Sequence, residues 1–185
     1  IDTARQVVEV EGMTSYVDLT DACLAHSCMP MVVPQLKSIT IGGAVSGIGI
    51  ESTSFRLGLP HETVNRMDVL LADGEVVECS PDNEHADLFF GIPNSYGTLG
   101  YITRLEARTL PVKPYVELEH LRYSDIDAYF GAVGDACHGD ADFIDGSIFA
   151  SDEMYLTLGR LRDRAPYTSD YSWLKMYFRS IRERQ

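Results

Sequence analysis

Apolar residues occupy every second position from Met67 to Leu71, which predicts a β-strand over residues 64–72. The alternate apolar positions from Met67 to Leu71 would share its buried face. The Asp73-Gly74 pair that follows is a strong signal for a two-residue hairpin turn. Residues 75–79 are therefore expected to return as the partner strand.

Similar periodicities predict strands and helices along the rest of the chain. Residues 38–41 are expected to form a strand that leads into a glycine-rich segment. Pro111 and Pro114 mark a boundary, and the order strand, helix, strand, strand after it is the opening of a ferredoxin-like unit. Besides the hairpin, we expect strands at residues 7–10, 101–110, 115–121, 142–149 and 153–161, and helices at residues 18–25, 83–90, 125–137 and 170–184.

The composition favours one or two compact domains, because 45% of the 185 residues are hydrophobic. The formal net charge of −13 repels nucleic-acid phosphates and anionic lipid headgroups, so neither is an expected partner. No apolar run in the sequence reaches the roughly 18 residues of a membrane span. The 4 cysteines form no CxxC pair and the 5 histidines have no ligand spacing, so we expect no metal site. Reduced thiols fit a cytoplasmic protein.

Both ends of the sequence look cut from a longer chain. The first residue is Ile1, which runs within a few positions into a strand, and the last residues stop inside a helical pattern. We therefore expect this chain to be a fragment.

Residues 40–52 contain four glycines and several small residues directly after the expected strand. Glycine lets a backbone approach a ligand closely, and consecutive N–H groups at a turn and helix start form an anion site. Thr40, Ser46 and Ser52 add hydroxyl groups, so this segment could hold a diphosphate without a lysine. A tight structural turn between a strand and a helix is the alternative. The spacing is not that of a Rossmann dinucleotide-binding motif, because Ser52 stands where the third glycine belongs.

A second segment with glycines lies just before the strand expected at residues 101–110. Gly97 and Gly100 bend the backbone there, and its peptide N–H and C=O groups could pair with the edge of a flat heterocycle. A helix-to-strand turn without a ligand is the alternative.

Six short motifs follow one another along the chain. They are Thr40-Ile41-Gly42-Gly43, Gly47-Ile48-Gly49, Arg56-Leu57-Gly58, Val69-Leu70-Leu71-Ala72-Asp73-Gly74, Ala86-Asp87-Leu88-Phe89 and Gly97-Thr98-Leu99-Gly100-Tyr101-Ile102-Thr103. In order and spacing they resemble the FAD-linked oxidases of the vanillyl-alcohol oxidase and p-cresol methylhydroxylase (PCMH) type. The resemblance covers roughly residues 1–112, and residues 49–52 and 72–74 are most similar to the sterol Δ24-reductase branch.

The resemblance implies an α+β fold, in which residues 1–112 are the second subdomain of a PCMH-type FAD-binding domain. Residues 113–185 would then begin a ferredoxin-like substrate (cap) domain. It also implies that residues 40–52 wrap the diphosphate and ribityl parts of FAD, and that residues 97–102 contact FAD through backbone groups. Nothing in the sequence matches the family's other phosphate loop. The cofactor-binding residues implied are Thr40, Ile41, Gly42, Gly43, Ala44, Ser46, Gly47, Gly49, Ile50, Glu51, Ser52, Gly97, Gly100, Tyr101 and Ile102.

The resemblance further implies an FAD-dependent oxidoreductase, in which the flavin performs hydride chemistry. By similarity to the sterol-reductase branch, the reaction would reduce a carbon–carbon double bond of a lipid-like substrate, a sterol or a fatty acyl chain. NADPH or NADH would supply the electrons. An oxidase or dehydrogenase of a small alcohol or hydroxy acid is one alternative, and a degenerate, non-catalytic binding module is another. The sequence identifies no catalytic residue, covalent flavin attachment or oligomeric state.

Overall fold

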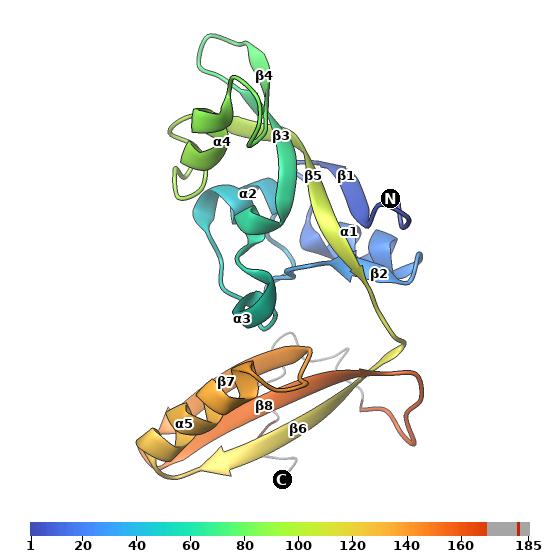
Figure 1. The fold of residues 1–185 in the computed structure, drawn as a ribbon, viewed down its shortest axis with the longest axis vertical. Coiled ribbons are helices and arrows are strands. Elements are labelled where there is room, and N and C mark those ends of the chain that lie inside the picture. Colours follow the sequence, from blue (N-terminus) through green and yellow to red (C-terminus); the bar gives the residue numbers. More distant parts are fainter. Residues whose placement is uncertain (170–180, 182–185) are drawn as a thin grey trace. The chain divides into compact units, whose positions relative to one another are not determined.

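The computed structural model describes residues 1–169 and residue 181. The chain forms two compact units, Ile1–Val112 and Lys113–Gln185, which are described separately (Figure 1). In the described part, no helix is long and apolar enough to cross a membrane. Mixed helices and antiparallel sheets agree with the expected α+β class.

The first unit is built on an antiparallel sheet in the order β1-β5-β3-β4, and β2 pairs with the far end of β5 (Figure 1). Its central strand is the long β5. The strands are β1 (Val7–Glu11), β2 (Cys28–Pro30), β3 (Val64–Leu70), β4 (Val76–Cys79) and β5 (Tyr101–Pro111). The helices are α1 (Tyr16–Leu24), α2 (Ile41–Gly47), α3 (Ser54–Leu57) and α4 (Ala86–Gly91), with a 3-10 turn, η1, at Pro60–Thr63.

One face of this sheet forms the hydrophobic core of the first unit. Leu105 on β5 lies between Val10 on β1 and Met67 on β3, and Val69 pairs with Val77 on β4. Buried side chains from α1 and α2 belong to the same cluster. Full burial of each large apolar side chain contributes about 1.5–3 kcal/mol relative to exposure.

The predicted hairpin is confirmed, but its loop consists of the three residues 72–74 and not of two. The N–H of Leu71 donates to the Glu75 carbonyl at 2.8 Å, and the N–H of Gly74 donates to the Leu71 carbonyl at 3.1 Å. Gly74 has φ +91, a left-handed conformation that glycine adopts without steric cost. This local turn pairs β3 with β4.

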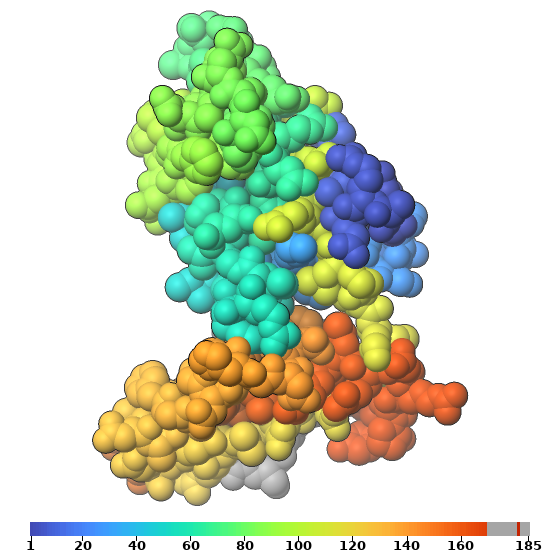
Figure 2. All heavy atoms as spheres, in the orientation of Figure 1, coloured from blue at the N-terminus to red at the C-terminus, as the bar shows by residue number. Residues whose placement is uncertain are grey.

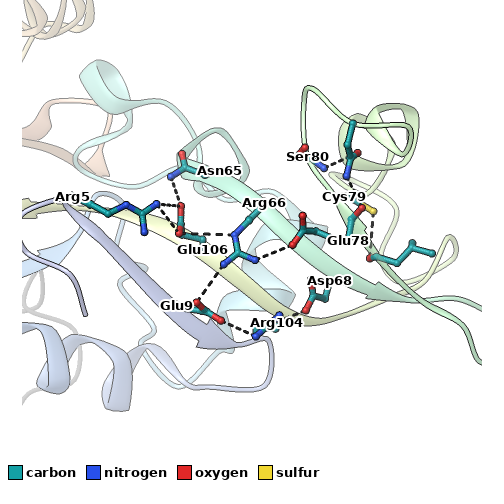
Figure 3. Close-up of polar contacts among 12 residues, drawn as sticks. Arg5, Glu9, Asn65, Arg66, Asp68, Glu78, Cys79, Ser80, Arg104 and Glu106 are labelled. Atoms are coloured by element: carbon teal, nitrogen blue, oxygen red, sulfur yellow. Dashed lines mark hydrogen bonds and ion pairs between the residues drawn. The ribbon is translucent and has the colours of Figure 1, made fainter.

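The opposite face of the sheet carries a network of charged residues (Figure 3). Arg66 on β3 forms ion pairs with Glu9 on β1 at 3.3 Å and with Glu78 on β4 at 3.0 Å. Glu106 on β5 is only 6% exposed, and it accepts hydrogen bonds from Asn65 at 2.9 Å and from Arg5 at 3.2 Å. Residues of opposite charge thus neutralise one another across β1, β3, β4 and β5.

Two predictions of secondary structure are wrong: the start of helix α1 and the strand at residues 38–41. Helix α1 begins at Tyr16, capped by Ser15, whereas Asp18 lies in its first turn and pairs with the Ser15 hydroxyl at 2.7 Å. Residues 38–41 are not a strand, because Thr40 caps helix α2 and its hydroxyl accepts the N–H of Gly43. At Ser15 and Thr40 a side chain caps a helix, although the β-branched residues nearby favour an extended conformation.

The second unit has the expected order of strand, helix, strand, strand. It consists of β6 (Tyr115–Tyr123), α5 (Ile126–Cys137), β7 (Phe143–Ala150) and β8 (Glu153–Arg162). Strand β8 lies between β6 and β7 and is antiparallel to both, so β6 and β7 run in the same direction. Tyr129 of α5 packs in the core against Met154 and Leu156. The helix expected at residues 170–184 lies outside the described residues, apart from residue 181.

Replacing Glu106 with glutamine is expected to lower the free energy of unfolding by about 1–2 kcal/mol at pH 7, because Arg5 and Arg66 lose a buried partner. The hydrogen bond from Asn65, opposed by burial and assisted by Arg5 and Arg66, holds the pKa of Glu106 below its usual value of 4.5. The ionised carboxylate therefore stabilises the fold above pH 4.5, and this contribution is lost as the pH falls through the lower folded-state value. Urea unfolding at pH 7 and at pH 3 measures both effects.

The exposed Glu75→Gln variant is the matched control and should be neutral at both pH values. An E106Q variant as stable as the parent at pH 7 would contradict the role given to this carboxylate.

Candidate cofactor site

The two glycine-containing segments, residues 40–52 and 93–103, meet at the surface of the first unit. The N–H of Tyr96 donates to the carbonyl of Ser46 at 3.2 Å. The Tyr96 ring lies over Gly47, since a Cβ added there would sit 3.7 Å from its Cε1 atom. In Figure 2 the cyan region after α2 adjoins the yellow-green region before β5. Residues about 50 positions apart thus form one surface.

The start of helix α2 is not the open anion site that its glycines predict. The N–H of Ile41 donates to the Thr14 carbonyl at 3.0 Å, and the N–H of Gly42 donates to the Gly12 carbonyl at 2.9 Å. The Thr40 hydroxyl accepts the N–H of Gly43 at 3.2 Å. These three donors are used within the chain, although not by strand pairing, so they are not free for a phosphate.

Unpaired amides occur instead at the other end of α2. Within the described part of the chain, the N–H groups of Ile48, Gly49 and Ile50 have no hydrogen-bond partner. Ile48 ends the helix with φ +56, which is uncommon for a β-branched residue. Successive unpaired N–H groups can bind an anion. Within residues 40–52, backbone donors for an anion are therefore available at residues 48–50 and not at the start of the helix.

The second segment offers amides of the same kind. Among the described residues, the N–H groups of Gly97, Leu99 and Gly100 lack a partner. The segment bends sharply, because Asn94, Tyr96, Gly97 and Gly100 all have positive φ. A Cβ on Gly100 would sit 2.6 Å from Val69 Cγ1, so packing itself requires glycine at this position.

The glycines of the first segment separate into two kinds. Gly42 is buried, and a Cβ there would lie 2.8 Å from the Gly12 carbonyl oxygen, so the fold requires it. At Gly47 and Gly49 a Cβ would make only ordinary contacts, 3.7 Å from Tyr96 and 3.6 Å from Pro60. The chain's own packing leaves these positions open. Such open backbone fits a nucleotide that approaches closely.

The remaining predicted site residues lie in several environments. Ile41 and Ala44 are buried in the core, and Ile102 packs against it. The Ser46 hydroxyl donates to the Gly42 carbonyl at 2.9 Å, and the Glu51 carboxylate accepts the N–H of Gln35 at 3.1 Å. Gly43, Ile50 and Tyr101 are exposed, and Ser52 is half-buried. Their contacts with a cofactor stay predictions.

The candidate site offers a ligand the partial positive charge of backbone N–H groups. It does not depend on the formal charge of metal ions or clustered cations. In the described ranges no group of His, Cys, Asp or Glu is placed to hold a metal ion. Tyr16 lies beneath the first segment, and burial, followed by the nearby Glu51 carboxylate, raises its pKa well above its usual value. Tyr16 therefore stays a neutral phenol in the core. Neutral amides are the donors left for a ligand.

Tyr96 lies outside the ranges that the resemblance implied, whereas Ile48 and Leu99 lie inside them but were not named as cofactor-binding residues. Their roles depend on the contact between Tyr96 and Ser46, which no local pattern reveals. An aromatic residue set between Ser95 and Gly97 was the one available signal, because an exposed aromatic beside a glycine turn is unusual.

Comparison with known proteins points to one cofactor. Residues 1–80 match the family described as "FAD binding domain". The chain is 32% identical over 166 residues to the Delta(24)-sterol reductase of Homo sapiens, covering 89% of this chain and 32% of that protein. It is 37% identical over 120 residues to the Delta(24)-sterol reductase of Pisum sativum, covering 65% of this chain and 21% of that protein.

A relative with a different name matches the same region. The chain is 32% identical over 129 residues to cytokinin dehydrogenase 10 of Oryza sativa subsp. japonica, covering 70% of this chain and 23% of that protein. The chain thus spans about a third or less of the length of these relatives.

Replacing Gly49 with alanine should leave the thermal unfolding temperature nearly unchanged but weaken FAD binding about tenfold, because the methyl group occupies space open only to a ligand. Gly42→Ala is the contrasting variant and should lower the unfolding temperature by several degrees, since its Cβ meets the Gly12 carbonyl. Calorimetry and FAD titration of the full-length protein measure the two effects. Unchanged FAD affinity in a folded Gly49→Ala variant would remove this residue from the site.

The open glycines, the unpaired amides and the lack of Lys or Arg within residues 40–52 and 93–103 suit a nucleotide held by backbone groups. The matched residues 1–80 include the whole first segment. On these grounds the chain belongs to the FAD-linked oxidase family, whose cofactor is FAD.

Proposed function

We propose that this chain is part of an FAD-dependent oxidoreductase that reduces a carbon–carbon double bond in a lipid-like substrate, a sterol or a fatty acyl chain. The observation that carries the FAD site is the contact between the two glycine-containing segments, through Tyr96 and Ser46. The reductase assignment is supported by the similarity to Delta(24)-sterol reductases over 89% of the chain.

The residues that would hold FAD are the unpaired amides on both sides of this contact. Those of residues 48–50 would donate to the diphosphate, and those of Gly97, Leu99 and Gly100 would donate to polar edges of the cofactor's rings. Bound FAD supplies hydride transfer. The chain's own part is to bind and orient it with neutral dipoles, which involves no proton exchange. This suits a chain with a formal net charge of −13.

We further propose that the two compact units correspond to two domains. Residues 1–112 would be the second subdomain of a PCMH-type FAD-binding domain, and residues 113–185 would begin the substrate domain. The division of the chain at Val112 supports this assignment. So does the order β6-β8-β7, which is that of the first three strands of a ferredoxin-like unit.

An oxidase or dehydrogenase of a small alcohol or hydroxy acid is the second candidate. It is favoured by one observation, the 32% identity to a cytokinin dehydrogenase over 70% of this chain. The two candidates differ in the direction of electron flow: a reductase takes electrons from NADPH or NADH, whereas a dehydrogenase takes them from its substrate.

We expect the purified full-length protein to be yellow, with flavin absorbance bands, and to lose that absorbance when NADPH or NADH is added without oxygen. The physical reason is that two-electron reduction of the flavin abolishes its long-wavelength absorption. Adding a sterol or acyl chain with the double bond should then restore the colour. Stopped-flow absorbance under anaerobic conditions measures both half-reactions.

Each of the other outcomes of this experiment supports a different function. Bleaching by a small alcohol but not by a nicotinamide would support the dehydrogenase. A colourless protein that takes up no added FAD would overturn the flavoenzyme proposal and leave a degenerate binding module.

A further inference from the structure

Tyr96 has a conformation that the fold alone does not explain. Its φ is +50, and its side chain is 73% exposed. A left-handed backbone is unfavourable for a residue with a Cβ, and glycine or asparagine would adopt it more easily. The hydrogen bond from its N–H to the Ser46 carbonyl could be formed by any residue except proline. Neither backbone pairing nor burial therefore requires a tyrosine here.

The surroundings of the Tyr96 ring are those of a binding surface. The ring stands over the open backbone of Gly47, with the unpaired amides of residues 48–50 beyond it. The next residue is Gly97, where an added Cβ would lie 3.3 Å from the ring of Tyr101, a second tyrosine that is 70% exposed. Two exposed aromatic rings thus belong to a surface that also carries the unpaired amides of residues 48–50 and of Gly97, Leu99 and Gly100.

This combination matches one kind of ligand chemistry. A flat heterocycle presents an apolar face, which stacks on an aromatic ring, and a polar edge, which accepts hydrogen bonds from backbone N–H groups. A phosphate alone would need the amides and not the rings. A lipid chain would need the apolar surface and not the amides.

We propose that the Tyr96 side chain is a cofactor-contacting residue that stacks on a planar ring of FAD and sets its position between the two segments. This inference rests on the proposed function, because it requires that the protein bind FAD. It goes beyond the backbone contacts expected from residues 97–102, since it assigns a role to a side chain.

The test is FAD binding by the full-length protein with glycine, phenylalanine or asparagine at position 96. Y96G and Y96N remove the ring and relieve the backbone, so they should be at least as stable as the parent, yet bind FAD about tenfold more weakly. Y96F keeps the ring and should keep the affinity. Tyr167→Gly is the matched control, because Tyr167 is 79% exposed and belongs to the other unit. It should bind FAD like the parent.

Two further readouts identify which ring is contacted. Titration with FMN, which lacks the adenine, should show the same loss in Y96G if the ring contacts the isoalloxazine, and no loss if it contacts the adenine. In the first case Y96F should also raise the fluorescence yield of bound flavin, since a phenol in contact quenches it by electron transfer. Either result supports the stacking role.

The proposal would be overturned if Y96G and Y96N fold normally and bind FAD as tightly as the parent. Tyr96 would then be only a backbone link between the segments. A parent protein that binds no FAD would instead refute the proposed function, so the two failures are distinguishable.

Discussion

Strand β5 ties the first unit together, because it pairs with β1, β3 and β2 along its length. Its first residue, Tyr101, follows directly after the bent segment at residues 94–100. Strand pairing therefore fixes one end of that segment, and the hydrogen bond from Tyr96 to Ser46 fixes its middle. This side of the candidate site is therefore attached to the strand that makes pairings with three others.

The two faces of this sheet stabilise the first unit by different interactions. Its core face holds Leu105, Met67 and Val69 in a cluster that α1 and α2 complete. Its other face holds Glu106 and Arg66 in a network of opposite charges. Successive residues of a strand point to opposite faces of the sheet, so each strand contributes side chains both to the core and to the charged network. The glycine-containing helix α2 is carried by the core face, which links the site to the packing of the whole unit.

Elements set by adjacent residues could be predicted from the sequence. The Asp73-Gly74 hairpin was found because its turn chemistry is local, and the strands and helix of the second unit were found from their periodicity. The strand expected at residues 38–41 included Thr40, which instead caps helix α2. This role depends on a contact between distant residues, in which the Gly12 carbonyl accepts the N–H of Gly42. The glycines were recognised as a group, but packing alone distinguishes Gly42 from Gly47. Contacts between distant residues are what the sequence could not supply.

The contact between Gly12 and Gly42 has a consequence for how this domain varies. Two backbones touch there with no room for a methyl group on either side, since a Cβ on Gly12 would also collide with the Ile102 carbonyl. A larger residue at one position cannot be offset by a smaller one at the other, because glycine is already the smallest. A substitution at either position must therefore move the backbone itself, because the obstacles are the carbonyl groups of Gly12 and Ile102 and not flexible side chains.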